Sequence, residues 1–206
     1  MPTPSPWKRL QDGNRRWLED RSTAGAGRGA LRRAETCQGQ NPFAVVLGCA
    51  DSRLPAEILF DQGLGDLFVV RTAGQVLDTA VLGSIEYAVE ALGVRLIVVL
   101  GHDGCGAVAA ATGIVDGAPV PPGHIRDIAS HVAPNVLRAR LDGATTPDEI
   151  GGQHTLYTAD LLRERSGIID AAARRRKVSV VPAQYNLSTG TVTRVAPIAA
   201  PVLIAA

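Results

Sequence analysis

The sequence lacks a marked excess of charge of either sign. Its 206 residues include 21 Lys and Arg and 20 Asp and Glu, so the formal net charge is +1. Nucleic-acid binding depends on clustered Lys and Arg that release counterions from phosphates. The one basic run, residues 174–177, is short, and the helix dipole favours such residues at a solvated helix end. We therefore expect no nucleic-acid partner.

Long apolar runs are also missing. No stretch approaches the roughly 20 apolar residues that span a bilayer, and residues 1–17 lack the apolar centre of a secretory signal peptide. We therefore expect a cytoplasmic protein with no membrane partner. A chain of 206 residues suits one domain, because typical domains have about 100–200 residues. The sequence thus predicts a single domain over residues 1–206.

Cysteine is scarce, with three residues in the chain. Three cysteines do not form a disulfide framework, and in a reducing compartment such thiols more often bind metal or take part in catalysis. Cys49 and Cys105 stand in polar loops that contain glycine, whereas Cys37 is expected to be an unreactive bystander. Cys49 and Cys105 are therefore the candidates for chemistry.

What the sequence does contain is a rhythm of short, β-branched apolar runs separated by polar loops. Such runs are typical of parallel strands buried on both faces. Helical spacing after the second run indicates a crossover helix, and a Ser-Thr-Gly turn after the fourth indicates an edge hairpin. The runs are 43–48, 66–71, 95–101, 177–187 and 191–195, with helices expected over 7–20, 78–93, 124–141 and 153–176. We expect an α/β fold: an open, mostly parallel β-sheet flanked by helices, with an antiparallel edge strand and an N-terminal helical arm.

Two polar loops leave the carboxyl ends of the first and third predicted strands. The first carries Cys49, Asp51 and Arg53, and the second carries His102 and Cys105. In a crossover sheet these strands can be neighbours, which would bring two thiolates, an imidazole and a carboxylate together. Zinc favours thiolate and imidazole ligands, and three firm ligands leave one position open, as in catalytic zinc sites.

Each of these residues also has a purely structural interpretation. A single cysteine such as Cys49 is more often a buried apolar residue, and a single histidine such as His102 is more often a hydrogen-bonded loop residue. Asp51 and Arg53 could form a local ion pair that contributes little. The combination of these groups at the ends of buried strands favours the zinc site.

Four blocks of this sequence resemble the signature blocks of the β-carbonic anhydrases: CADSR at 49–53, RTAGQ at 71–75, SIEYAV at 84–89 and GHDGCGAV at 101–108. The resemblance covers most of the chain and is weakest between about residues 112 and 176. It implies a carbonic anhydrase, a lyase, with one Zn²⁺ per chain on Cys49, His102 and Cys105. It further implies that Asp51 and Arg53 form a catalytic dyad, which orients zinc-bound hydroxide for the reversible hydration of CO2 to bicarbonate and a proton. In some members the residue equivalent to Asp51 binds zinc itself in a closed state.

The resemblance also implies a substrate pocket and an assembly. Gln40, Phe68, Tyr87 and Gly106 match positions that line the substrate site of the family, some of them contributed by the neighbouring subunit. The expected assembly is a homo-oligomer, either a homodimer or a multiple of dimers such as a homotetramer. Residues 1–40 would form a helical arm that packs on the partner subunit.

Two other functions stay open at this point. Some members of the wider family use the same fold and zinc site to hydrolyse COS or CS2, although RTAGQ with SIEYAV resembles the enzymes that act on CO2. A non-catalytic zinc or thiol redox sensor would release metal when Cys49 and Cys105 are oxidised. The intact Asp51 and Arg53 favour an enzyme over a sensor.

The remaining histidines have no metal-ligand spacing. His124, His131 and His154 are therefore expected to have surface or packing roles. Asp103 follows a predicted ligand and either orients it or adds polarity to the loop.

Overall fold

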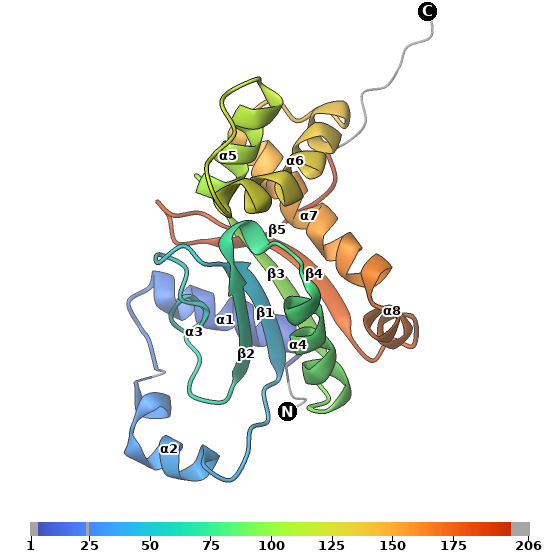
Figure 1. Ribbon diagram of the computed structural model, residues 1–206. Coiled ribbons are helices and arrows are strands. Elements are labelled where there is room, and N and C mark those ends of the chain that lie inside the picture. Colours follow the sequence, from blue (N-terminus) through green and yellow to red (C-terminus); the bar gives the residue numbers. More distant parts are fainter. Residues whose placement is uncertain (1–3, 24, 199–206) are drawn as a thin grey trace, which may run out of the picture.

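The computed structural model describes residues 4–23 and 25–198 and contains a five-stranded sheet in the order β2-β1-β3-β4-β5. The first four strands of this order are parallel, and β5 pairs antiparallel with β4 at the edge (Figure 1). The predicted open, mostly parallel sheet with an antiparallel edge strand is thus confirmed. The strands are β1 (Ala44–Cys49), β2 (Leu67–Thr72), β3 (Leu96–His102), β4 (Ser179–Tyr185) and β5 (Val192–Arg194).

Helices and short 3₁₀ turns account for the other regular elements of the described chain. In chain order they are α1 (Pro6–Leu18), η1 (Ala26–Arg28), α2 (Ala30–Thr36), α3 (Ala56–Leu59), η2 (Ala73–Gln75), α4 (Thr79–Glu90), α5 (Gly106–Val115), α6 (Ile125–Leu141), α7 (Pro147–Arg165) and α8 (Gly167–Arg174). Within residues 4–23 and 25–198, no helix is both long enough and apolar enough to cross a membrane.

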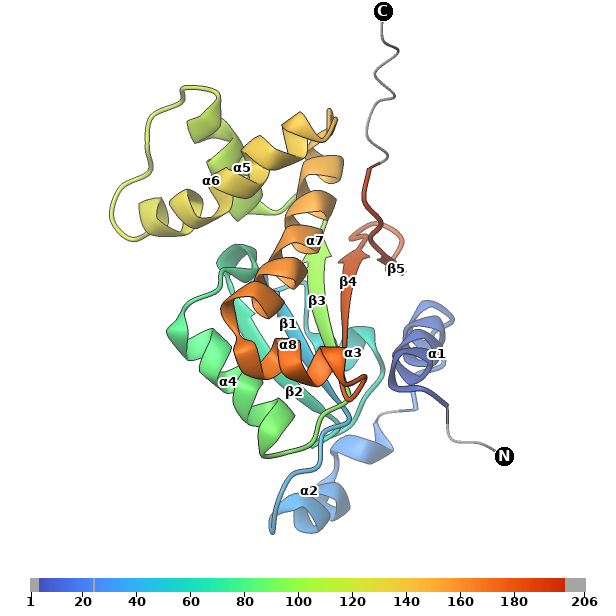
Figure 2. The same cartoon turned by 90° about the vertical axis from the view of Figure 1, so that its right-hand side faces the viewer.

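Side chains at alternate positions of the central strands enter two apolar layers. Val45 and Leu47 of β1 join a layer formed with α4, α7 and α8, whereas Val46 joins a layer formed with α1, α3, α5 and α6. In Figure 2, α4 and α8 lie on one side of the sheet and α1 and α3 on the other, whereas α5 and α6 lie beyond the carboxyl ends of the strands. All three valine and leucine side chains are fully buried. Burial on both faces explains why the strands are continuous apolar runs in the sequence.

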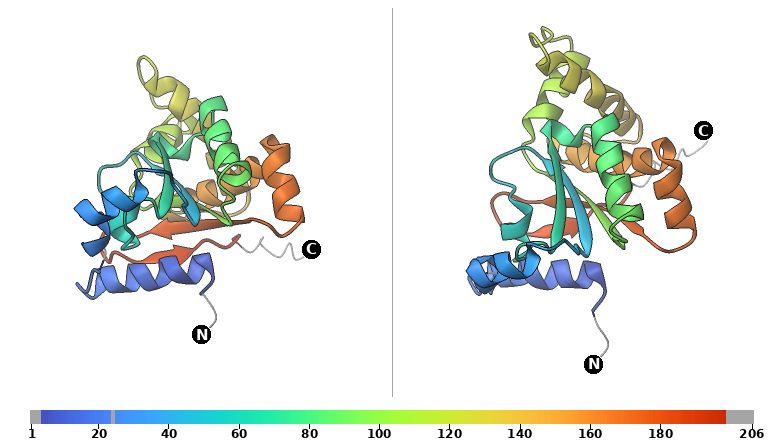
Figure 3. Two further views of the ribbon diagram at one scale, coloured as in Figure 1. Left: turned by 90° about the horizontal axis from the view of Figure 1, so that it is seen from below. Right: turned by 60° about the horizontal axis from the view of Figure 1, so that its bottom comes forward.

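The N-terminal helix α1 packs against its own chain. Its apolar stripe buries Trp7 and Leu10, and the side chain of Asn14 donates to the carbonyl of Gly190 at 2.9 Å. The helix runs along the β4–β5 hairpin (Figure 3). The apolar stripe of α1 therefore packs on α3 and on the β4–β5 hairpin of the same chain. That residues 1–40 pack on a partner subunit stays a prediction.

The helix predicted over 153–176 differs from the structure, which has two helices there. α7 begins earlier, because the side chain of Thr146 caps it and Glu149 completes a capping box. It ends at Ser166, whose backbone is extended, with φ −124° and ψ 106°. The Ser166 hydroxyl accepts the N–H of Ile169 at 3.1 Å and so starts α8. One residue therefore ends one helix and caps the next.

Candidate metal centre

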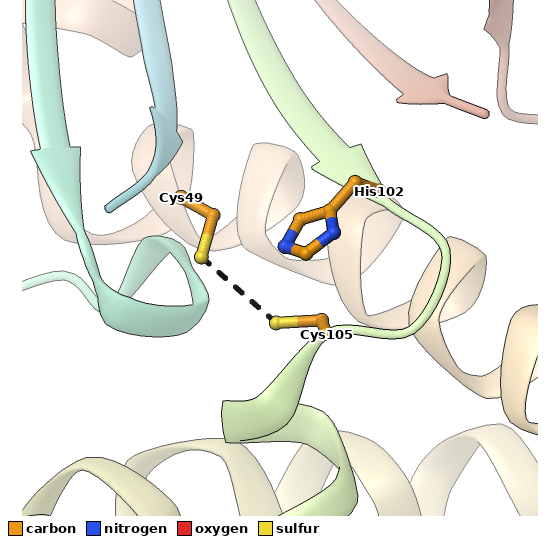
Figure 4. A group of neighbouring side chains, drawn as sticks. All are labelled: Cys49, His102 and Cys105. Carbon is orange, nitrogen blue, oxygen red and sulfur yellow. Dashed lines mark hydrogen bonds between the residues drawn. The ribbon is translucent and has the colours of Figure 1, made fainter. Parts of the chain in front are cut away.

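The three predicted metal ligands meet at the carboxyl ends of two neighbouring strands. Cys49 is the last residue of β1 and His102 the last residue of β3, while Cys105 directly precedes α5. The strands β1 and β3 are adjacent and parallel, so their ends lie side by side. The ligand atoms of the three residues all lie within 4.8 Å of one another. Their side chains point into one common space (Figure 4).

The donor atoms suit a zinc ion. The Nδ1 atom of His102 lies 2.8 Å from the carbonyl oxygen of Asp103, which can only accept, so Nδ1 carries the proton. The Nε2 atom therefore offers a lone pair, yet it is buried and has no hydrogen-bond partner among the described residues. A buried polar atom without a partner costs about 1–3 kcal/mol. Two sulfur atoms and this nitrogen form the soft ligand set that zinc favours.

The two thiols influence each other directly. The Sγ atoms of Cys49 and Cys105 lie 4.0 Å apart, close enough for a hydrogen bond between them. This hydrogen bond lowers the pKa of Cys49 below that of an ordinary thiol. The same bond, together with burial, raises the pKa of Cys105. A divalent cation stabilises both groups as thiolates, so metal binding would release protons from this pair.

Asp51 and Arg53 form a pair beside these ligands. Arg53 donates through Nε to Asp51 Oδ1 at 2.9 Å and through Nη2 to Asp51 Oδ2 at 2.7 Å. The two hydrogen bonds hold the pKa of Asp51 well below its usual range. Asp51 Oδ2 lies 3.9 Å from His102 Nε2. The carboxylate is therefore ionised and adjacent to the proposed metal position.

Two further residues fix the loops that carry the ligands. Arg71 of β2 donates to the backbone carbonyls of Cys49 and Asp51, which holds the first loop against the sheet. Asp103 accepts the N–H of Leu187 through Oδ1 at 2.7 Å, which ties the second loop to the β4–β5 hairpin. Asp103 therefore has two roles: its backbone carbonyl orients His102, and its carboxylate anchors the loop.

A cleft of about 370 Å³ lies beside the ligands, between α5 and the start of α7. His102 and Cys105 form part of its wall, and Val108, Ala109 and Pro147 contribute apolar surface. An apolar cleft with a few polar groups is a suitable binding place for a small, weakly polar molecule.

None of the four predicted substrate residues lines this cleft. Gly106 follows Cys105 directly, but Phe68 pairs with Val45 near the start of β1. Cys49 is four positions after Val45, which is roughly 13 Å along a strand. The half-exposed Tyr87 packs near Phe68, with ring centroids 6.4 Å apart. Gln40 lies on the segment before β1 and is exposed. Gln40, Phe68 and Tyr87 are therefore at the opposite end of the sheet from the metal ligands of their own chain.

One histidine near the centre has more contacts than the sequence suggested. His124 and His131 are exposed, as expected. His154 is buried on α7 and hydrogen-bonds both to Asn135 and to the turn that contains Gly74. No motif or spacing in the sequence connects His154 with Asn135 or Gly74, so their contact could not be predicted from the sequence.

Comparison with known proteins agrees with the fold and the centre. The family model for carbonic anhydrase matches residues 44–192. A protein of Mycobacterium tuberculosis named carbonic anhydrase 2 is 48% identical over 193 residues, which cover 92% of this chain and 93% of the relative. A carbonic anhydrase of Mycolicibacterium smegmatis is 49% identical over 195 residues, covering 93% and 94%. The solved structure of a Coccomyxa β-carbonic anhydrase in complex with acetazolamide covers 93% of this chain and 86% of its own, with a TM-score of 0.71 and 26% identity.

The chain belongs to the β class of carbonic anhydrases. It is therefore an enzyme, a lyase whose substrates are carbon dioxide and bicarbonate, and its Cys49, His102 and Cys105 form a metal site typical of this class.

Proposed function

We propose that this chain hydrates CO2 reversibly at one Zn²⁺ bound by Cys49, His102 and Cys105, with Asp51 and Arg53 as the catalytic dyad. The observation that carries the proposal is the buried S₂N ligand set, in which His102 Nε2 has no hydrogen-bond partner among the described residues. An ionised carboxylate lies 3.9 Å from that nitrogen. A site with only a structural role would more naturally have four protein ligands.

The dyad accounts for the orientation of the nucleophile. Zinc, when bound, would lower the pKa of water toward neutrality and so supply hydroxide at neutral pH. Asp51 is held ionised by Arg53 and can only accept a hydrogen bond. The nucleophile must therefore donate a hydrogen bond to Asp51, which leaves an oxygen lone pair free to face the carbon of CO2. Bicarbonate and a proton are the products.

A closed state is also proposed for Asp51. Its Oδ2 atom is near His102 Nε2 and therefore near the place where a fourth ligand would bind. Leaving Arg53 would break two hydrogen bonds, and binding of the carboxylate would compete with hydroxide. Because hydroxide becomes more abundant as pH rises, high pH favours the open state with the Asp51–Arg53 pair intact.

The substrate pocket is proposed to be shared between two copies of the chain. Gly106 borders the metal site of its own chain, whereas Gln40, Phe68 and Tyr87 lie at the far end of the sheet. A homodimer or a multiple of dimers would let these three residues complete the pocket of a second copy. Tyr87 is 52% exposed in the single chain and is thus available for such a contact.

The test is stopped-flow CO2 hydration across pH, with the zinc content measured on the same sample. We expect about one zinc per chain and a rate that rises with pH. Cys105→Ser should lose zinc and activity together. Cys37→Ser is the matched control, because Cys37 is an exposed free thiol.

A fully active, zinc-free Cys105→Ser protein would overturn the proposal. Stoichiometric zinc without CO2 hydration at any pH would redirect the search to COS and CS2 as substrates, and then to a sensor of oxidants.

A further inference from the structure

A buried polar network connects α6 and α7 to the turn that follows β2. His154 Nε2 lies 2.7 Å from the carbonyl oxygen of Gly74, and His154 Nδ1 lies 3.0 Å from Asn135 Nδ2. His154 and Asn135 are 3% and 8% exposed. The network is therefore shielded from water. In such a buried place each hydrogen bond is costly to lose, because no water replaces the missing partner.

The partners fix the protonation of the imidazole. A carbonyl oxygen can only accept, so His154 Nε2 carries a proton and donates it to Gly74. The amide nitrogen of Asn135 can only donate, so His154 Nδ1 must be the acceptor. Burial also lowers the pKa of His154. The residue is thus a neutral imidazole in a single tautomer, set by Asn135.

The turn that His154 contacts has an unusual backbone. Gly74 has φ +64° and the next residue, Gln75, has φ +51°, so two consecutive residues adopt the left-handed region that most residues avoid. A Cβ atom on Gly74 would lie 2.7 Å from Ala107 Cβ and 3.3 Å from Val132 Cγ2. The turn is therefore pressed against α5 and α6, and it needs external contacts to hold its shape.

Gly74 also contacts the proposed metal centre. Its N–H points at Cys49 Sγ, with the nitrogen and sulfur 3.5 Å apart. One glycine thus donates to a metal-binding sulfur through its N–H and accepts from His154 through its C=O. Hydrogen bonds to metal ligands orient them and tune their strength as donors.

We infer that His154, fixed by Asn135, is a positioning residue that holds the Gly74 N–H on the Cys49 thiolate and thereby strengthens metal binding. The inference rests on the proposed function only in taking Cys49 as a metal ligand. His154 acts on the metal site through the backbone carbonyl and N–H of Gly74, and it contacts neither metal nor substrate.

Two substitutions at His154 separate this role from simple packing. The amide nitrogen of Gln is three bonds from Cβ, as is Nε2 of His, so His154→Gln can still donate to Gly74. The amide of Asn ends two bonds from Cβ, at the place of Nδ1, so His154→Asn cannot reach the carbonyl. Both replacements are polar and uncharged, and they differ mainly in this one hydrogen bond.

The first readout is the rate and equilibrium of zinc loss to a competing chelator. We expect His154→Asn to weaken zinc binding by roughly 10- to 100-fold, as losses of such outer contacts commonly do. His154→Gln should stay within a few-fold of the unsubstituted protein. The cobalt-substituted proteins should show the same order in their sulfur-to-cobalt charge-transfer band. His131→Asn, on the exposed surface of α6, is the control.

The second readout needs no substitution. In the unsubstituted protein loaded with a spin-active cadmium isotope, the amide proton of Gly74 should show scalar coupling to cadmium through Cys49 Sγ. Absence of that coupling would overturn the inference even if His154→Asn failed to fold. Equal zinc affinity in His154→Asn and His154→Gln would also overturn it. Failure of the unsubstituted protein to bind zinc would instead refute the proposed function.

Discussion

The replacement of Asp51 by Asn tests the proposed dyad most directly. The substitution keeps the size of the side chain but removes its charge and one of its two acceptor atoms. Arg53 donates to both carboxylate oxygens, at 2.9 and 2.7 Å, so the amide NH₂ of Asn would face a guanidinium donor. The pair would separate, and the side chain at position 51 could then donate a hydrogen bond to the nucleophile as readily as accept one.

The size of the effect follows from the position of the charge. Asp51 Oδ2 is 3.9 Å from His102 Nε2, which is the nitrogen we assign to the metal. A nucleophile bound near that nitrogen could donate a hydrogen bond to Asp51, and a hydrogen bond to a charged group contributes about 1.5–3 kcal/mol. This corresponds to roughly 10- to 150-fold in rate, and positioned acid–base groups contribute about 10²- to 10⁴-fold. We expect kcat/KM of Asp51→Asn to fall by roughly 10²- to 10³-fold while zinc stays near one per chain.

The assay is stopped-flow CO2 hydration on samples of known zinc content. Asp170→Asn serves as the control, because Asp170 is also held by arginines, Arg163 at 2.9 Å and Arg174 at 2.6 Å, but on α7 and α8 away from the centre. The control should keep full activity. A zinc-loaded Asp51→Asn enzyme with a rate within threefold of the unsubstituted protein would refute the role of the dyad.

Three further outcomes are expected. Because Arg53 holds the pKa of Asp51 well below its usual range, Asp51 stays ionised between about pH 6 and 9. The rate of CO2 hydration should therefore rise with pH over this range as zinc supplies hydroxide. A rate that does not change with pH while the zinc content stays constant would contradict this. Gly101→Ala should lower the melting temperature markedly, since its Cβ would lie 2.1 Å from Thr155 Oγ1, and an unchanged melting curve would show that α7 can shift. Inactive Cys105→Ser and Phe68→Ala proteins should regain partial CO2 hydration when refolded together, because each supplies what the other lacks; a mixture without activity would argue against a shared pocket.

The sequence allowed the metal centre to be predicted because each ligand stands at or just after the end of an apolar run, and because the blocks around the ligands resemble those of the β-carbonic anhydrases. Cys49 and His102 are each the last residue of a strand that is apolar at nearly every position. Such strands are buried on both faces of the sheet. Parallel pairing of β1 with β3 then brings their carboxyl ends together without any further information. The pair Asp51 and Arg53 is local and needs only the turn after β1.

The network behind the centre could not be predicted in the same way. Asn135, His154 and Gly74 come from α6, α7 and η2, and their meeting depends on how two helices pack over the ends of the strands. Helix packing is set by many small side-chain contacts that leave no spacing pattern in the sequence. The break at Ser166 was missed for a similar reason, because apolar residues continue at helical spacing on both sides of it.

The strand order explains why one chain holds a complete set of ligands but only part of the proposed pocket. β1 lies between β2 and β3. The connection after β1 leads to β2 on one side of it, and the connection after β2 leads to β3 on the other side. Crevices form at such a reversal, at the carboxyl ends of the strands, and β1, β3 and the turn after β2 all contribute to the surroundings of Cys49. The amino ends of the same strands carry Phe68 and, nearby, Tyr87. No bending of a twisted sheet brings both of its ends to one point, so residues at the amino ends can serve a metal centre only if that centre belongs to another copy of the chain.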